Sequence, residues 1–174
     1  MNHLNMEIKA RCFNPEKIRN ILKERRADFK GLDHQIDTYF KVNQGRLKLR
    51  EGTIEKSLIF YQRQNQKNIK ESKVMIINLQ ETSKIKKILS EANGVLVIVD
   101  KKREIYFIDN VKFHLDQVQD LGSFVEIEAI DNGGHLEEKE QLLKQCQEYL
   151  DLFEIKEENL IDCSYSDLFL NKNF

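Results

Sequence analysis

The sequence predicts a mainly antiparallel β protein of the α+β class, in which eight strands close into a barrel or tunnel with flanking helices. Two observations support this fold: period-two alternation recurs along the chain, and tight turns join most of the alternating segments. Eight antiparallel strands tend to close into a barrel because closure removes free strand edges. Tight turns favour antiparallel neighbours because parallel strands need long crossovers. The expected strands span residues 3–13, 33–42, 46–50, 57–63, 73–79, 95–108, 111–118 and 124–130.

The first expected strand alternates without a break from residue 4 to residue 11, with apolar side chains at even positions and polar ones at odd positions. Such a strand has two different faces. Its polar face points either at bulk water or into a wet, enclosed cavity, and one strand alone leaves both open. The second strand has the same habit, and Asn43-Gln44-Gly45 after it has the composition of a hairpin turn.

Helices are expected at two of the connections between strands and after the sheet. Asn14 suits an N-cap and Pro15 the first helical position, so a helix follows the first strand and ends before Gly31. Residues 81–92 have helical spacing, and the Asn-Gly pair at 93–94 closes that helix as a C-cap. Two further helices are expected at residues 135–150 and within residues 157–174.

The composition indicates one globular domain over residues 1–174, with a net charge of only -1. This balance gives no reason to expect a nucleic-acid or membrane-surface binder. The three cysteines, Cys12, Cys146 and Cys163, form no CxxC pair, which argues against a zinc site or a disulfide framework. No apolar run resembles a signal peptide or is long enough to span a bilayer, so we expect a cytoplasmic protein.

Lysine and arginine recur at alternate positions of several expected strands. Each cation taken singly reads as a solvated surface residue. As a set they would place like charges opposite one another on neighbouring strands, which destabilises a sheet. A bound polyanion would offset that cost. The candidate phosphate-binding residues are Lys9, Arg11, Lys48, Arg50, Arg63, Lys73, Lys101 and Arg103.

Carboxylates form a second group. Glu126 and Glu128 share one face of a strand, about 7 Å apart, and Asp116 lies on the preceding strand, where His114 has the same parity. Hard cations such as Mg²⁺ or Mn²⁺ prefer oxygen ligands and also take substrate phosphates. Salt bridges to the basic strands are the alternative. The candidate metal ligands are Glu7, Asp116, Glu126 and Glu128.

Together the two groups predict a metal–polyphosphate site lining one cavity. The sequence holds no P-loop, no GxGxxG and no Ser-His-Asp spacing, so nucleophilic hydrolysis and Rossmann binding have no support.

The order of several short motifs resembles that of the CYTH superfamily, also called triphosphate tunnel metalloenzymes, which includes class IV adenylyl cyclases and thiamine triphosphatases. The resemblance covers nearly the whole chain. It depends on EIK at 7–9 (the family's ExExK), DTYF at 37–40, LKLR at 47–50, VDKKR at 99–103, LDQV at 115–118, LGSFVEIE at 121–128 and the tail at 164–168.

This resemblance implies an eight-stranded antiparallel tunnel, dependence on Mg²⁺ or Mn²⁺, and a substrate that carries a triphosphate. The acids and cations named above match or align with the family's metal-binding and phosphate-binding positions. Lys9, Glu7 and Tyr39 are candidates for catalysis, and nothing in the sequence selects among them. One departure stands out: Asn5 replaces the first acid of ExExK, so the site should hold its cations more weakly, or hold one ion instead of two.

The function that the resemblance favours is that of a class IV adenylyl cyclase-like enzyme, which converts ATP to cyclic AMP and pyrophosphate. A triphosphatase that hydrolyses thiamine triphosphate or inorganic triphosphate is the first alternative. A non-catalytic module that binds polyphosphates or nucleotides is the second. In each case the expected partner is a small-molecule triphosphate, with no nucleic acid and no membrane, and the protein is expected to be a monomer or a homodimer.

Overall fold

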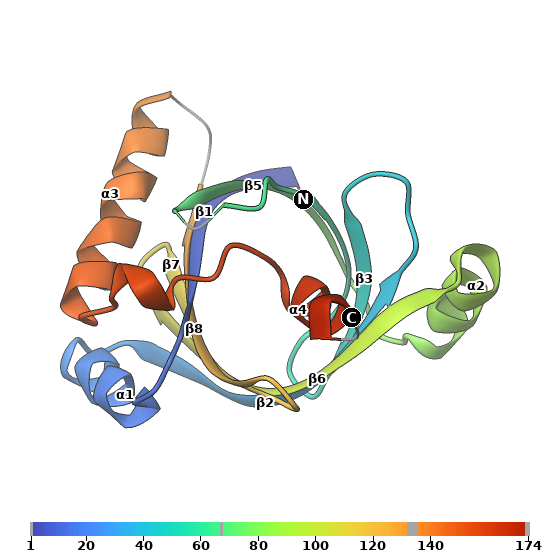
Figure 1. Ribbon diagram of the computed structural model, residues 1–174, viewed down its shortest axis with the longest axis horizontal. Helices are drawn as coiled ribbons and strands as arrows, with labels where there is room; N and C mark the ends of the chain where they lie inside the picture. The colour runs from blue at the N-terminus through green and yellow to red at the C-terminus, as the bar shows by residue number, and fades with distance from the viewer. Residues whose placement is uncertain (1, 67, 132–135, 173–174) are drawn as a thin grey trace.

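Eight antiparallel strands form a closed barrel in the computed structural model, which describes residues 2–66, 68–131 and 136–172 (Figure 1). The order around the ring is β1-β5-β4-β3-β2-β6-β7-β8. This confirms the predicted fold class. The strands are β1 (Asn2–Arg11), β2 (Asp28–Phe40), β3 (Arg46–Gly52), β4 (Lys56–Gln62), β5 (Lys70–Asn78), β6 (Val95–Ile108), β7 (Val111–Val118) and β8 (Gly122–Ile130).

Four α-helices flank the barrel, with one 3-10 turn before the last of them. Asn14 caps the first helix as expected, because its side chain accepts a hydrogen bond from the backbone N–H of Lys17 at 3.1 Å. The elements are α1 (Pro15–Glu24), α2 (Ser83–Asn93), α3 (Leu136–Leu152), η1 (Glu157–Asn159) and α4 (Tyr165–Lys172). Residue 135, the expected first residue of the third helix, lies outside the described residues.

Six of the eight strands differ from the prediction at one or both ends, and the starts of β2 and β5 differ by more than two residues. β2 begins at Asp28 instead of residue 33, because α1 already ends at Glu24 and the chain turns through Arg26, whose φ is 56°. Gly31 is therefore not a helix stop; with a φ of 126° it lies at an irregularity in the pairing of β2 with β6. β5 begins at Lys70 instead of residue 73, so Lys70 belongs to the strand as well as Lys73.

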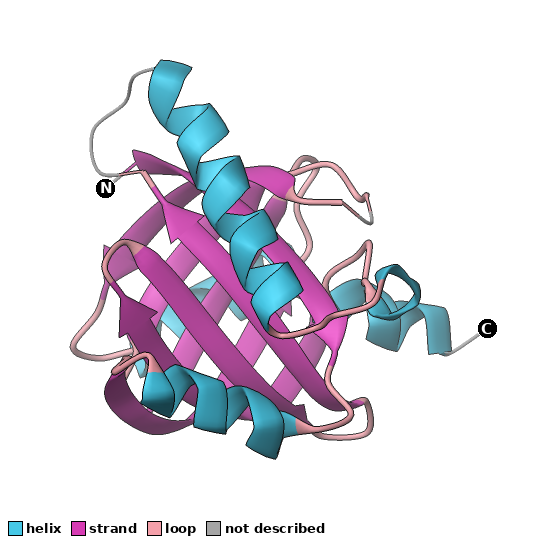
Figure 2. Ribbon diagram, turned by 90° about the vertical axis from the view of Figure 1, so that its left-hand side faces the viewer, coloured by secondary structure: helices cyan, strands magenta, loops and turns pink. Residues whose placement is uncertain are grey.

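Much of the apolar core lies outside the barrel. Apolar residues at even positions of β1 and at odd positions of β7 and β8 face outward and are buried, and α1 and α3 cover them (Figure 2). The shared core includes Met6, Ile8, Leu22, Phe113, Val125, Ile127, Leu142, Cys146 and Phe153. The apolar side chains on this outer face bury enough surface against the helices to stabilise the fold. The inner face of the same strands can therefore carry polar groups.

A second apolar cluster lies where α4 covers one opening of the barrel (Figure 1). Tyr165 of α4 packs there against Phe124 of β8, with ring centroids 5.0 Å apart. None of the helices in the described parts of the chain combines the length and the apolar composition that crossing a membrane requires.

This inside-out arrangement predicts unequal costs for two isoleucine truncations on the outer surface of the barrel. Ile127 of β8 is 1% exposed in the core shared with the helices, so Ile127→Ala should lower the free energy of unfolding by about 2–5 kcal/mol. Ile77 of β5 is 60% exposed, so Ile77→Ala should change it by no more than about 0.5 kcal/mol. Urea unfolding measures both, and equal losses would contradict the placement of the core.

Candidate functional site

The barrel interior holds a cavity of about 1720 Å³ that receives charged as well as apolar side chains, and all eight strands contribute to it. Alternation places the odd-numbered residues of β1 and β6 and the even-numbered residues of β7 and β8 on this inner face. The charged residues that alternate along the sequence therefore meet in one enclosed space instead of facing bulk water.

Three cations converge on the buried carboxylate of Asp37 in β2. Arg50 of β3 donates from Nε and Nη2 at 2.9 and 3.0 Å, Lys48 from Nζ at 3.0 Å, and Lys101 of β6 from Nζ at 2.6 Å. Burial alone would raise the pKa of the Asp37 carboxyl, but these cations hold it well below its usual range. Burial lowers the pKa of Lys101 to about 7 despite the contact with Asp37, and nearby cations add to this effect.

Carboxylates line the wall formed by β1 and β8. Glu7 lies directly opposite Glu128 in the pairing of these strands, and Lys9 lies opposite Glu126. Lys9 Nζ is 3.2 Å from Glu126, and Glu7 forms an ion pair with Arg63. Two facing carboxylates at one level of the barrel are a concentration of negative charge that a divalent cation would neutralise.

Arg103 of β6 links this wall to β7. It donates to both oxygens of Asp116 at 2.6 Å and to Glu126 at 2.9 Å. Tyr165 of α4 donates its hydroxyl to Asp116 at 2.7 Å. His114 lies 3.1 Å from Glu126 through Nδ1, and burial lowers its pKa to about 4, with the charge of Arg103 as the next cause. His114 is therefore neutral at pH 7.

Three carboxylates of β1 and β8 lie across the barrel from the lysine and arginine of β3, and each side also holds a charge of the other sign, such as Lys9 beside Glu126 and Asp37 beside Arg50. Around the ring, β2 lies four places from β1, and β3 lies four places from β8. The acidic wall of β1 and β8 thus faces the strands that carry Asp37, Lys48 and Arg50. A phosphate chain between them would meet cations on one side and metal-binding oxygens on the other.

The structure places most of the predicted site residues in this cavity. The cations and carboxylates found there are Lys9, Lys48, Arg50, Arg63, Lys101, Arg103, Glu7, Asp116, Glu126 and Glu128. Tyr39, a candidate for catalysis, is also buried there, with Lys48 Nζ 5.5 Å from its ring centroid. The alternative role expected for these acids, salt bridges to the basic strands, is also observed. Among the four described acids, Glu7, Asp116 and Glu126 each form an ion pair with a lysine or an arginine. Glu128 accepts a hydrogen bond from Asn5.

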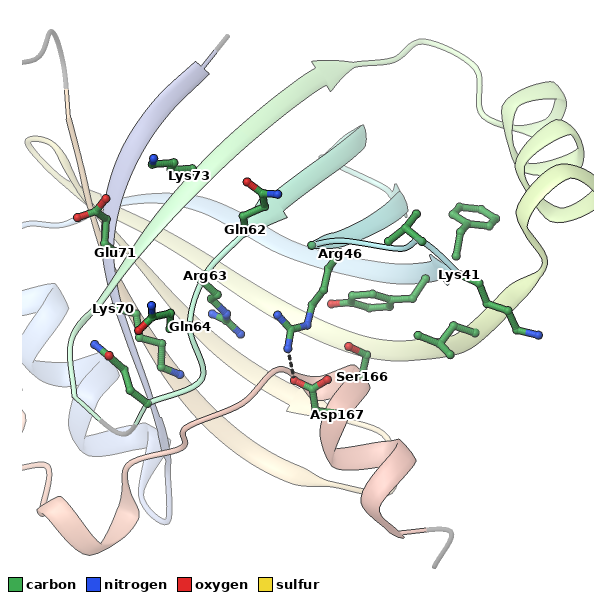
Figure 3. Close-up of a pocket in the computed structure, with 16 residues that line it drawn as sticks. Lys41, Arg46, Gln62, Arg63, Gln64, Lys70, Glu71, Lys73, Ser166 and Asp167 are labelled. Atoms are coloured by element: carbon green, nitrogen blue, oxygen red, sulfur yellow. Dashed lines mark hydrogen bonds and ion pairs between the residues drawn. The ribbon is translucent and has the colours of Figure 1, made fainter.

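Two predicted cations lie elsewhere. Arg11 is exposed at the end of β1 and donates to the carbonyl of Leu121 at 3.2 Å. Lys73 is exposed on β5, whereas Lys70 is buried (Figure 3). Ser72 is buried on the same inner face as Lys70. The inward position expected for Lys73 is therefore corrected: Lys70 lies opposite the inward-facing Glu7 in the pairing of β5 with β1, and Lys73, three positions further along the strand, points outward.

Sequence reasoning overlooked several interior residues. The alternation of β2 places Asp37 on the same face as Tyr39, so the pattern itself carried this signal. No comparable signal pointed to Glu55, which lies in a turn, or to Tyr165, which reaches the cavity from outside the sheet. Lys112 shares its strand face with His114 and was not recognised as part of the site.

The C-terminal segment closes part of the barrel opening next to α4. Ile161 donates its N–H to the carbonyl of Lys9 at 2.8 Å and accepts from Lys70 Nζ at 3.0 Å. Arg46 of β3 binds Asp167 of α4 at 2.6 Å, as Figure 3 shows. A cavity of about 930 Å³ remains beside these contacts. The opening is thus narrowed by a segment that contacts β1, β3 and β5.

The residues present fit a divalent cation at β1 and β8 in part. Within the described part of the chain, no three His, Cys, Asp or Glu side chains already converge as ligands. The Oδ1 atom of Asn5 is buried without a hydrogen-bond partner there, while its Nδ2 donates to Glu128. Asn5 is thus an unused oxygen donor next to the Glu7–Glu128 pair. Asp116 fits less well, because Arg103 and Tyr165 occupy its oxygens.

Comparison with known proteins agrees with this architecture. The family model of the CYTH domain matches residues 3–165. The structure of the PH1012 protein from Pyrococcus horikoshii is similar at 25% identity and a TM-score of 0.81, covering 94% of this chain and 98% of that one. None of the curated proteins compared matches the chain.

Two further solved structures share the fold at lower identity. An adenylate cyclase candidate from Vibrio parahaemolyticus is 16% identical with a TM-score of 0.80, covering 97% of this chain and 99% of that one. An adenylyl cyclase candidate from Hippeastrum, described as having a dominant triphosphatase activity, is 12% identical with a TM-score of 0.63, covering 98% and 96%.

The Asp37 cluster predicts a variant that is less stable but binds anions better. Asp37→Asn removes the carboxylate that Lys48, Arg50 and Lys101 share, two of them buried, so it should lower the free energy of unfolding by about 3–5 kcal/mol. Inorganic triphosphate should then raise the melting temperature of the variant more than that of the native protein. Asp100→Asn, which removes a partly exposed carboxylate bound to His34, is the control. Equal ligand-induced shifts in all three proteins would contradict the assignment.

Proposed function

Because the chain belongs to the CYTH family, we propose that it is a divalent-metal-dependent enzyme that acts on a small-molecule triphosphate inside its barrel. The observation that carries this proposal is the opposition of two walls. Lys48, Arg50 and Lys101 surround one buried position on one side, and Glu7, Glu126 and Glu128 line the other. Such an enclosed arrangement suits a highly charged, linear anion better than it suits an apolar ligand.

The cations are proposed to bind and orient the phosphate groups. Arg50 and Arg103 offer planar forks that match phosphate oxygens, and each is now held in place by a carboxylate. Lys48 and Lys101 add point charges beside the Asp37 carboxylate. Because these groups are fixed before the substrate enters, little reorganisation is needed when charge develops on the phosphates.

A Mg²⁺ or Mn²⁺ ion would be held by Glu7 and Glu128, with Asn5 Oδ1 and Glu126 beside them. When bound, it would neutralise charge on the phosphate oxygens. Lys9 pairs with Glu126 and lies 4.0 Å from the ring centroid of Tyr165, so it can orient that carboxylate and also contact substrate. Glu7, Lys9 and Tyr39 remain the proposed candidates for catalysis.

The reaction favoured by the motifs is that of a class IV adenylyl cyclase, in which the ribose hydroxyl of ATP attacks the α-phosphate and pyrophosphate leaves. One structural observation favours hydrolysis instead. The Nε2 atom of His114 is buried without a hydrogen-bond partner in the described structure, and Nδ1 faces Glu126. A neutral imidazole held in this way can accept a hydrogen bond from a water molecule placed to attack a phosphate.

A product-resolved assay distinguishes the two reactions. Purified protein is incubated with ATP, thiamine triphosphate or inorganic triphosphate in the presence of Mg²⁺ or Mn²⁺. Formation of cyclic AMP and pyrophosphate from ATP is the expected result. Release of orthophosphate alone would show that the protein is a triphosphatase and not a cyclase for these substrates. Glu126→Gln should reduce either activity, since it weakens the contacts to Lys9 and Arg103. No turnover with any metal, combined with tight binding, would leave only a binding module.

The place of Asn5 predicts how the metal affinity can be raised. Asn5→Glu adds a third carboxylate next to Glu7 and Glu128, and it should tighten Mn²⁺ binding by about tenfold. Asn5→Gln has the same length without the charge and is the matched control. Titration calorimetry with Mn²⁺ alone measures both. If the two variants bind Mn²⁺ equally, the ion does not bind at this wall.

A further inference from the structure

The turn between β3 and β4 is fixed by one buried carboxylate. Asp33, which is fully buried, accepts the backbone N–H groups of Ile54 at 2.8 Å and Glu55 at 3.0 Å, and the hydroxyl of Thr53 at 2.8 Å. Gln35 donates to it at 2.7 Å. The turn is therefore anchored at several points, and its position relative to the barrel is set before any ligand binds.

Gly52 allows the turn to come this close. A Cβ atom at position 52 would lie 2.6 Å from an oxygen of Asp33 and 2.6 Å from the carbonyl oxygen of Glu55. The N–H of Gly52 also donates to that carbonyl at 2.9 Å. A side chain at position 52 would push the turn away from the barrel. The glycine therefore allows the turn to stay in contact with Asp33.

This anchored turn directs the Glu55 side chain into the end of the barrel distant from α4. Its carboxylate accepts from Arg50 Nη1 at 2.8 Å, from Lys112 Nζ at 2.6 Å and from Gln35 Nε2 at 3.1 Å. Arg50 comes from β3 and Lys112 from β7, three places apart around the ring. Glu55 thus links β3 to β7 across the end of the barrel. Its pKa lies well below its usual range: burial opposes ionisation, but these two cations outweigh it.

The contacts of Glu55 are those that a phosphate group would make. Arg50 is shared between Asp37, deeper in the barrel, and Glu55, at its end. The interior cations Lys48, Lys101 and Arg50 are therefore followed by Lys112 at the end of the barrel. The carboxylate of Glu55 lies between Arg50 and Lys112. Asp37 is buried within a strand, whereas Glu55 belongs to a turn and its side chain is 25% exposed.

We propose that Arg50 and Lys112 form a further phosphate subsite that Glu55 occupies, and that Glu55 thereby selects triphosphates against chains with a fourth phosphate. This inference rests on the proposed function, since it extends the same phosphate-binding row. A fourth phosphate must displace a carboxylate whose turn cannot withdraw, and until it does so the two anions repel each other. Glu55 is a specificity-determining residue in this account and takes no part in the chemistry.

Titration calorimetry with inorganic triphosphate and linear inorganic tetraphosphate, each with Mg²⁺, tests this selection. The native protein should bind triphosphate more tightly than tetraphosphate. Glu55→Gln removes the negative charge and should improve tetraphosphate binding relative to triphosphate by at least about tenfold. Glu51→Gln is the matched control, because Glu51 lies four residues earlier on the outer face and binds Thr82 and Lys86. It should leave the ratio of the two affinities unchanged.

A double variant ties the effect to the subsite. Adding Lys112→Gln to Glu55→Gln should abolish the gain for tetraphosphate. Glu55→Asp is the second single variant if Glu55→Gln does not fold, because a carboxylate shorter by one methylene cannot span both cations and should shift the ratio in the same direction.

Each result decides between the two claims. Equal affinities of the native protein for both phosphates, or an unchanged ratio in the Glu55 variants, would overturn the selection while leaving the proposed function intact. If the native protein binds neither phosphate, the proposed function fails, and this inference fails with it.

Discussion

The structure depends on the mutual neutralisation of charges that a closed barrel removes from water. A buried ion that loses its partner is costly, and each partner in the Asp37, Asp116 and Glu126 groups holds at least one other in place. This network explains how strands that each carry several like charges can lie side by side. It also sets the chemistry of the cavity, because the same cations that satisfy carboxylates in the free protein have the geometry to satisfy phosphates.

A charged interior is compatible with a stable fold only because a large hydrophobic core lies outside the barrel. The outward faces of β1, β7 and β8 pack against α1 and α3, so alternation serves two purposes at once (Figure 2). In these three strands the apolar half supplies stability and the polar half supplies the site. A one-residue shift of register would exchange these halves, which makes the pattern of each strand a strong constraint on the fold.

Alternation also explains how much the sequence could predict. It identified eight antiparallel strands, the closed barrel and most of the interior cations, because inward positions repeat every second residue. It assigned Lys73 instead of Lys70 because the register of β5 against β1, which places Lys70 opposite Glu7, cannot be read from the sequence after the polar loop. Glu55 and Tyr165 were beyond its reach, since a turn and a C-terminal helix carry no period-two signal and enter the barrel only through tertiary contacts. The departure at Asn5 was visible in the sequence, and the structure adds its unpartnered oxygen.

The central claim is that a triphosphate lies between an acidic wall and a basic wall. A crystal structure with inorganic triphosphate and Mn²⁺, with the ion located by anomalous scattering, tests it most directly. We expect Mn²⁺ beside Glu7 and Glu128 and phosphate oxygens against Lys48, Arg50 and Lys101. Phosphate bound only on the outer surface, or Mn²⁺ located away from β1 and β8, would contradict it.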